Sequence, residues 1–227
     1  MTQMTQTHWP HAAARRLGRA TALAALILAA TAPRAAAQSD GWHIGGYAMV
    51  GTMSFSASES FEAVLGTSSG TLFGGGATVG LPWGGLFFSV GASRVSEQGE
   101  RVLVLDGRVY PLGIPLTVKV TPVEVTGGWQ FRGLSRRFVP YVGGGFSSYA
   151  YQESSTFAAA GEDTDERFSG YHVLGGAEFK VAGWLGVGGE FAWTTVPDAL
   201  GAGGVSEAFD DTDLGGTSLR LKITIGR

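Results

Sequence analysis

The chain has 227 residues with a formal net charge of −3, no cysteine and 37 glycines. An acidic balance argues against nucleic acid as a partner, because nucleic-acid binding depends on clustered cations. The absence of cysteine excludes a fold held together by disulfide bonds. Glycine is well above its usual share of roughly 7%, and the glycines are scattered within strand-like patterns, as in a small and tightly curved closed sheet.

The first 37 residues have the features of a cleavable secretory signal peptide. A basic segment over 15–19 precedes a short apolar run over 21–30, and Ala35-Ala36-Ala37 offers a small-residue cleavage site. The apolar run is too short for a transmembrane helix, which needs about 20 residues. The segment carries four arginines and no acidic residue, so its removal takes the net charge from −3 to −7. We expect one mature domain over 38–227.

Alternation of polar and apolar residues predicts eight strands in this domain. The final stretch gives the clearest pattern, because Arg220 and Lys222 alternate with a set of aliphatic residues on the opposite face. The connections between the strands alternate between long and short, which is typical of an antiparallel up-and-down membrane barrel. We expect the last strand to pair with the first, because a sheet edge left open in lipid has unpaired backbone groups. The predicted strands cover 41–55, 71–81, 86–93, 116–131, 138–151, 168–181, 185–194 and 215–227.

Two places in this pattern are less regular. Residues 97–115 predict a small hairpin around Asp106-Gly107 that stands above the membrane, with a ten-stranded barrel as the alternative. In 116–131 the apolar residues change parity at Pro122. Because proline cannot donate to a sheet ladder, we expect a β-bulge there.

The segment Pro140-Tyr141-Val142-Gly143-Gly144-Gly145, the alternating aromatic residues and the closing strand resemble the OmpA/OmpX-like family of small outer-membrane barrels. The resemblance covers 41–227. It implies a location in the cell outer membrane, with both termini in the periplasm. It also implies outer-membrane lipid, lipopolysaccharide and the barrel assembly machinery as partners, and a role in envelope integrity or in surface interaction through the long loops.

One face of the predicted strands carries charged residues that we expect to point into the barrel. The interior of an eight-stranded barrel is only wide enough for side chains to fill it, so buried charges must be paired. This predicts a filled lumen, which the resemblance also favours. The alternative is a narrow or gated porin-like channel lined by the same residues: Glu124, His172, Glu178, Lys180, Glu190, Arg220 and Lys222.

A third possibility is an outer-membrane enzyme that acts on lipid A. Ser169 and His172 are three residues apart, and this odd spacing on a strand places them on opposite faces, so they form no catalytic dyad. The acidic clusters at 162–166 and 207–213 match no cation-binding loop and are expected to be solvated. We therefore expect no catalytic residue, no metal and no cofactor.

Four tryptophans are expected at the membrane interfaces, where amphipathic rings lie at the level of the lipid headgroups. Trp83 and Trp184 fall at short turns and would mark the periplasmic side, and Trp129 and Trp193 complete the set. The alternative fold is a soluble, lipocalin-like barrel, which would present the charged face to water and the apolar face to its interior.

Overall fold

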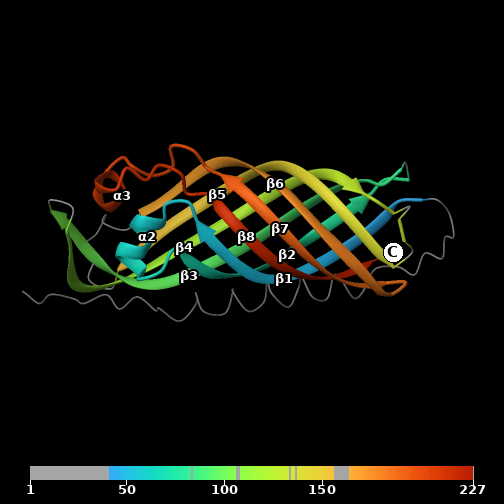
Figure 1. The fold of residues 1–227 in the computed structure, drawn as a ribbon, viewed down its shortest axis with the longest axis horizontal. Helices are drawn as coiled ribbons and strands as arrows, with labels where there is room; N and C mark the ends of the chain where they lie inside the picture. The colour runs from blue at the N-terminus through green and yellow to red at the C-terminus, as the bar shows by residue number, and fades with distance from the viewer. Residues whose placement is uncertain are drawn as a thin grey trace, which may run out of the picture. The chain divides into compact units, whose positions relative to one another are not determined.

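The computed structural model describes residues 41–226, except 83, 106–107, 133, 136 and 156–163. The expected signal peptide therefore lies outside the described residues. Eight strands form a closed antiparallel barrel in which each strand pairs with its neighbours in sequence and β8 pairs with β1 (Figure 1). The prediction of an eight-stranded up-and-down barrel is confirmed. The strands are β1 (His43–Phe55), β2 (Ser69–Gly80), β3 (Leu86–Leu105), β4 (Arg108–Gln130), β5 (Phe138–Ser155), β6 (Thr164–Ala182), β7 (Leu185–Thr195) and β8 (Gly216–Gly226).

The barrel has two different ends. The start of β1 and the end of β8 lie together with the strand ends at Gly80, Gln130 and Ala182, and we call this the turn end. The opposite ends of the strands lie together at the other end of the barrel, which we call the loop end (Figure 1). The predicted alternation of long and short connections fails between β3 and β4, where the strands themselves extend and only two residues join them.

The loop end carries two short helices that the sequence pattern did not reveal. They are α2 (Ser58–Leu65) and α3 (Gly204–Ala208), in the connections after β1 and after β7. The helix α2 ends at Gly66, whose φ of 72° is a left-handed conformation that favours glycine, and the Gly66 N–H donates to the Glu62 carbonyl. No helix in the described part of the chain is long and apolar enough to cross a membrane.

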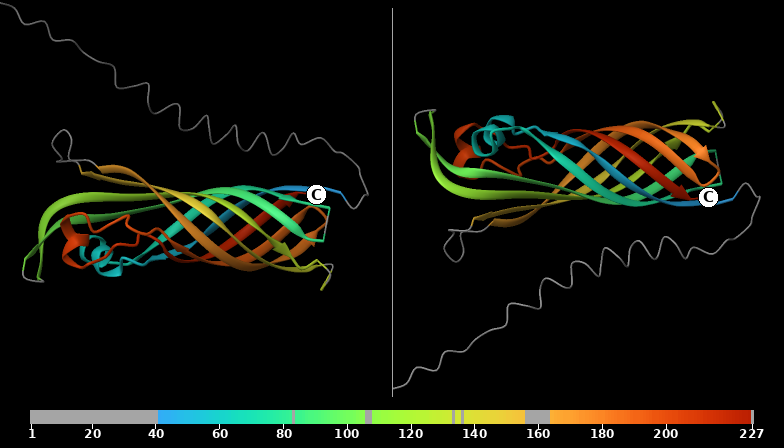
Figure 2. Two further views of the ribbon diagram at one scale, coloured as in Figure 1. Left: turned by 90° about the horizontal axis from the view of Figure 1, so that it is seen from above. Right: turned by 90° about the horizontal axis from the view of Figure 1, so that it is seen from below.

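The strands β3 and β4 are the longest, with 20 and 23 residues. Residues 97–115 form a hairpin in which Leu105 lies opposite Arg108, as predicted, but its arms are direct continuations of β3 and β4, so the strand ends expected at 93 and 116 were wrong. The pairing of β2 with β3 ends at Val95 and the pairing of β4 with β5 ends at Leu116, whereas β3 and β4 stay paired out to Leu105 and Arg108. The outermost part, over 99–105 and 108–115, is a two-stranded ribbon that projects at the loop end (Figure 2). We call it the β3–β4 ribbon.

The expected β-bulge at Pro122 is also absent from the described register. The β3–β4 pairing runs from Ala92 opposite Val123 to Val95 opposite Val120 without a shift, and Pro122 lies opposite Tyr149 in β5. The register shift between β3 and β4 lies farther out, between Glu100 and Val102.

The change in parity at Pro122 instead marks the level at which the apolar residues change from the inner to the outer face of the barrel. Toward the loop end they point inward, and toward the turn end they point outward. On β4, the even-numbered side chains point inward along the whole described strand from Leu116 to Thr126. The inward residues are apolar up to Val120 and polar from Glu124 onward, while the outward residues change from polar to apolar at Val123. The same inversion occurs on β3, where the outward face changes from Val90 to Arg94.

The loop-end half therefore contains an apolar core inside the barrel. Phe61 of α2 stacks on Phe55 of β1 with ring centroids 4.1 Å apart and planes at 9°, so the helix closes the top of this core. Val196 and Leu214, which flank the last long connection, are also completely buried. The core residues on the strands are Met49, Met53, Phe55, Leu72, Val95, Leu116, Val118, Val120, Tyr149 and Tyr151.

The turn-end half has an apolar outer belt. On β6 the belt runs from Tyr171 to Val181, which is about 33 Å along the strand at about 3.3 Å per residue. With the usual strand tilt of about 40° this corresponds to about 25 Å along the barrel axis, the height of the apolar band of an outer-membrane barrel. On β8 the belt consists of Leu219, Leu221, Ile223 and Ile225, all exposed.

Candidate functional site

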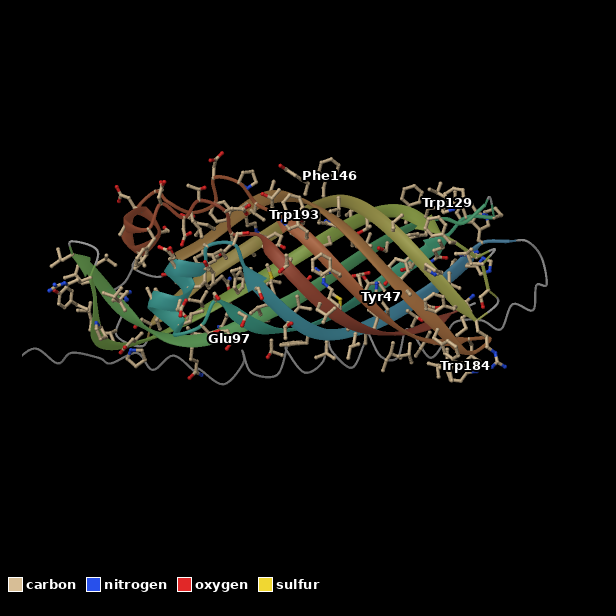
Figure 3. The ribbon with its side chains drawn as sticks, viewed as in Figure 1. Tyr47, Glu97, Trp129, Phe146, Trp184 and Trp193 are labelled. Atoms are coloured by element: carbon tan, nitrogen blue, oxygen red, sulfur yellow. The ribbon has the colours of Figure 1, made fainter. Side chains whose placement is uncertain are left out.

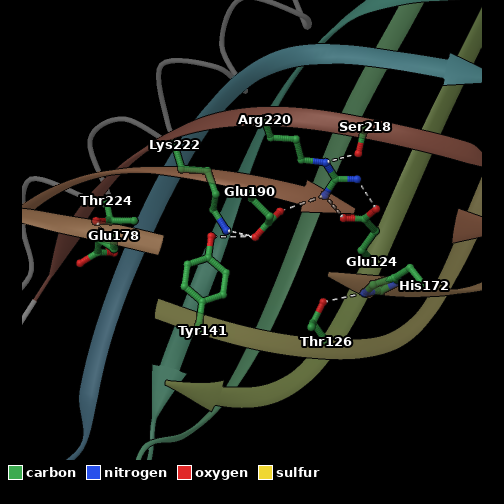
Figure 4. Close-up of polar contacts among 10 residues, drawn as sticks. All are labelled: Glu124, Thr126, Tyr141, His172, Glu178, Glu190, Ser218, Arg220, Lys222 and Thr224. Carbon is green, nitrogen blue, oxygen red and sulfur yellow. Dashed lines mark hydrogen bonds and ion pairs between the residues drawn. The ribbon is translucent and has the colours of Figure 1, made fainter. Parts of the chain in front are cut away.

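The centre of the turn-end half is a buried ion-pair cluster that joins opposite sides of the barrel. Arg220 of β8 donates two hydrogen bonds to Glu124 of β4, from Nη1 to Oε2 at 2.7 Å and from Nη2 to Oε1 at 2.8 Å (Figure 4). Its Nε donates to Ser218 Oγ at 2.9 Å. Arg220 is 3% exposed and Glu124 is 5% exposed, so the pair is shielded from solvent.

A second ion pair continues the cluster toward the turn end. Lys222 Nζ lies 2.9 Å from Glu190 Oε2, and the same oxygen accepts a hydrogen bond from Tyr141 Oη at 3.0 Å. The Lys222 ammonium also lies 4.2 Å from the centre of the Tyr47 ring, a cation–π contact. Glu190 is 3.4 Å from Arg220, which links the two pairs. Two acidic and two basic side chains thus lie together with balanced charge, three of them buried and Lys222 partly buried, which offsets the cost of removing them from water.

Three other residues that we predicted in this group lie outside these ion pairs. His172 is buried, and its Nε2 lies 2.9 Å from Thr126 Oγ1 in a polar layer next to the cluster. Glu178 accepts a hydrogen bond from Thr224 Oγ1 at 2.8 Å (Figure 4). Lys180 lies near the turn end, where it lines a cavity of about 150 Å³ below the cluster.

The mouth of this cavity carries a small polar cluster. Arg132, in the connection between β4 and β5, donates to Gln130 Oε1 at 2.7 and 2.9 Å, and its Nη1 lies 3.1 Å from His43 Nδ1. Partial burial lowers the pKa of the Arg132 guanidinium, and the Glu178 carboxylate acts in the opposite direction. In the described part of the chain, no group of three or more His, Asp or Glu side chains could hold a metal ion.

Glycines make room for the two lumenal tyrosines. A Cβ atom at Gly91 would lie 2.2 Å from the Tyr47 hydroxyl, and one at Gly176 would lie 2.7 Å from the Tyr141 hydroxyl. Each glycine therefore leaves room for a tyrosine ring close to the barrel wall, with Gly91 two strands away from Tyr47 and Gly176 on the strand next to Tyr141. This explains part of the high glycine content noted in the sequence.

Three of the four predicted interface tryptophans are described, and they lie on the outer surface at the ends of the apolar belt. Trp129 and Trp184 lie at the turn end, and Trp193 lies farther toward the loop end, near Phe146 (Figure 3). All three are exposed. Trp83 lies outside the described residues.

Sequence reasoning missed several residues that build the site. Tyr47 and Tyr141 share the inward parity of the charged residues, which is the signal that could have revealed them. The acidic residues of the last connection are also more than a solvated run. Asp213 accepts hydrogen bonds from the backbone N–H groups of Val196 and Gly215, both at 2.7 Å, and Asp211 accepts from Ser60 N and Oγ of α2.

Together, the closed sheet, the apolar outer belt and the charged interior define a transmembrane β-barrel, since only a closed sheet pairs every backbone group within lipid. A soluble barrel would show the opposite arrangement in this half, whereas here Leu221 is 63% exposed and Glu190 is 3% exposed.

The chain belongs to the outer membrane protein beta-barrel domain family, which it matches over residues 22–221. It is therefore an outer-membrane protein, as the resemblance in its sequence implied. A comparison with curated protein sequences finds no match.

Solved structures of outer-membrane barrels are similar to this chain over most of its length. Neisserial surface protein A shares 15% identity, with 83% of this chain and 96% of that chain covered and a TM-score of 0.46. The N-terminal barrel domain of Pseudomonas aeruginosa OprF shares 8% identity, with 81% and 97% covered and a TM-score of 0.46. The attachment invasion locus protein of Yersinia pestis shares 10% identity, with 82% and 95% covered and a TM-score of 0.45.

Proposed function

We propose that this protein is a non-enzymatic outer-membrane barrel with a filled lumen, which holds its loop-end half at the cell surface for envelope integrity or surface interaction. The observation that carries this proposal is that side chains block the lumen at two separate levels. The ion-pair cluster closes the lumen at the inner end of the turn-end cavity, and the apolar core fills the loop-end half. A continuous water path would have to cross both, which argues against the channel alternative.

The absence of a suitable catalytic arrangement in the described residues supports a non-enzymatic role. His172 points into the lumen and is buried, while Ser169 lies on the outer surface of the same strand. The buried carboxylates of Glu124 and Glu190 are engaged by cations, so neither is a free general base.

The surface that fits a recognition role is the β3–β4 ribbon. Its exposed apolar side chains are unusual for a segment surrounded by water, and neighbouring strands do not cover its edges in the described register. Exposed apolar surface and open strand edges are both typical of interaction sites. The exposed apolar residues are Leu103, Leu105, Val109, Tyr110 and Leu112.

We orient the loop end outward and both termini toward the periplasm, because short turns face the periplasm in barrels of this kind. The lack of native cysteine allows a direct test with single-cysteine variants and a membrane-impermeant maleimide. Leu112→Cys in the ribbon should be labelled on intact cells. Gly183→Cys at the turn end should be labelled only after lysis, and the reverse pattern would overturn the orientation.

Insertion and closure are tested on mature protein refolded into detergent micelles or liposomes. A compact band in SDS that shifts on heating is expected for a closed barrel, and planar bilayers containing it should show no stable conductance. A steady single-channel current would favour the narrow channel over the filled lumen. A protein that stays folded and soluble without detergent would overturn the membrane role itself.

A further inference from the structure

The cavity at the turn end is large enough for a small organic molecule. It has a volume of about 150 Å³ and extends from the ion-pair cluster, where Arg220 and Lys222 line it, to the strand ends at Ala182 and Gly226. An apolar cavity of about this volume in a protein interior binds a benzene ring. The ion-pair cluster closes the inner end, so a molecule that enters can stay in the cavity without passing through the barrel.

One part of the cavity wall is apolar and aromatic. Phe87 of β3 and Tyr141 of β5 meet edge to face, with ring centroids 6.0 Å apart and planes at 85°. Phe87 is 5% exposed and Val139 is 4% exposed, and Leu174 of β6 lines the same space. Apolar and aromatic walls with a few well-placed polar groups are typical of small-molecule sites.

Two cations in the cavity wall have no carboxylate partner among the described residues. The Arg132 guanidinium is held by neutral atoms, Gln130 Oε1 and His43 Nδ1, and these contacts engage three of its five N–H groups. The Lys180 ammonium makes no hydrogen bond or ion pair with any residue that the structure describes. Both cations lie close enough to His43 to act on its charge, so they lie in one region of the wall.

The charges that line the cavity leave an excess of positive charge. The two ion pairs of the cluster are balanced. Among the described residues of the wall, Glu178 is the only other acid, and its Oε2 accepts a hydrogen bond from Thr224 Oγ1 at 2.8 Å (Figure 4). Arg132 and Lys180 thus outnumber Glu178, and a recess with an excess of one sign of charge attracts the opposite ion.

We propose that the turn-end cavity binds a small aromatic carboxylate, with its ring against Phe87 and its carboxylate at Arg132 and Lys180. Arginine suits this role because its planar guanidinium donates paired hydrogen bonds to carboxylate, and Arg132 keeps two N–H groups for a ligand. This inference goes beyond the proposed function and does not depend on the orientation of the barrel. In the orientation proposed above, the ligand enters from the periplasm.

The test is a titration of the refolded wild-type barrel in uncharged detergent micelles with 4-fluorobenzoate, whose fluorine NMR signal reports binding. Two further probes separate the ring from the charge. 4-Fluorobenzamide has the same ring without the charge, and acetate has the charge without the ring. Empty micelles give the background from partition into detergent.

The variant R132Q/K180Q removes both cations from the cavity wall. The matched control is R94Q/R167Q, which removes the same charge from exposed positions of β3 and β6 on the outer surface. Heat-shifted mobility in SDS checks that each variant is folded.

The wild type and the control are expected to bind 4-fluorobenzoate saturably and at least tenfold more tightly than R132Q/K180Q, and high salt should weaken this binding. The wild type should bind 4-fluorobenzamide at least tenfold more weakly than 4-fluorobenzoate, and this comparison needs no substitution. Acetate should displace 4-fluorobenzoate only at a much higher concentration, because it cannot cover the apolar wall.

Equal binding of 4-fluorobenzoate and 4-fluorobenzamide by the wild type would overturn the proposal, as would an equal loss in R94Q/R167Q. Displacement by acetate at the concentration of the probe would show that any anion suffices and would also overturn it, as would the lack of saturable binding to the wild type. Conductance in planar bilayers tests the filled lumen separately, so failure of this proposal and failure of the proposed function are distinguishable.

Discussion

Arg220 and Glu124 form a two-pronged ion pair across the full width of the barrel, because β8 and β4 are four strands apart in either direction around the closed sheet. A contact of this kind joins opposite walls that backbone pairing cannot connect. It also fills the lumen at its centre, where an eight-stranded barrel has room for side chains and little else.

Glu124→Gln should destabilise the barrel by about 3–5 kcal/mol, since removal of one partner leaves the other buried charge poorly compensated. Urea unfolding in liposomes, followed by tryptophan fluorescence, measures this loss. The double variant E124Q/R220M should recover much of it, because the buried charge is then gone from both sides. Strictly additive effects of E124Q and R220M would contradict the coupling.

Leu221→Arg should cost about 2–4 kcal/mol or prevent insertion, because Leu221 faces lipid on the strand that closes the barrel. Lys222→Leu replaces the next side chain, which points into the lumen, and should remove only the ion pair with Glu190. The fraction of protein with heat-shifted mobility after refolding measures insertion. Equal effects of the two substitutions would overturn the assignment of the two faces.

Leu72→Ala should lower the free energy of unfolding by about 2–5 kcal/mol, the range expected when a large side chain is removed from a packed core. Leu72 is completely buried in the loop-end core. Phe73→Ala, on the neighbouring residue of the outer face, is the control and should have a much smaller effect. If F73A is the more damaging substitution, the loop-end half does not contain the inward core described above.

Asp213→Ala should loosen the last long connection, because the Val196 and Gly215 amides would lose their acceptor. Each buried donor left unpaired costs about 1–3 kcal/mol. Faster hydrogen exchange at these amides and faster proteolytic cleavage within 197–213 are the expected readouts. Glu207→Ala removes an exposed acid from the same connection and should change neither measurement.

The barrel itself could be predicted because strict alternation extends over each strand where it crosses the belt. The full lengths of β3 and β4 could not be predicted, because the apolar residues move from one face of the strand to the other where the strand leaves the apolar belt. Around Pro122 this change of face resembled a β-bulge, although the backbone register is continuous there. The helices α2 and α3 are too short for a periodic pattern to stand out.

The charged residues of the interior could be predicted as a set from their shared parity, but their partners could not. Pairing of Glu124 with Arg220 depends on which strands lie opposite each other and on how the register staggers around the barrel. Tyr47 and Tyr141 join Lys222 and Glu190 through that same geometry. The hydrogen bonds of Asp211 and Asp213 depend on the folding back of a long connection, which no local pattern encodes.

Near Pro122 the apolar residues change from the inner to the outer face of the barrel, and this level fixes the depth of the barrel in a bilayer. A shift toward the periplasm by one pair of residues would bring Arg94 and Arg167 closer to hydrocarbon, where a cation costs about 2–4 kcal/mol at the midplane. A shift in the other direction would lift Phe146 and Tyr171 into water and draw the turn-end residues Trp129 and Trp184 inward. We therefore expect the membrane to adapt its thickness to this barrel rather than the barrel to slide.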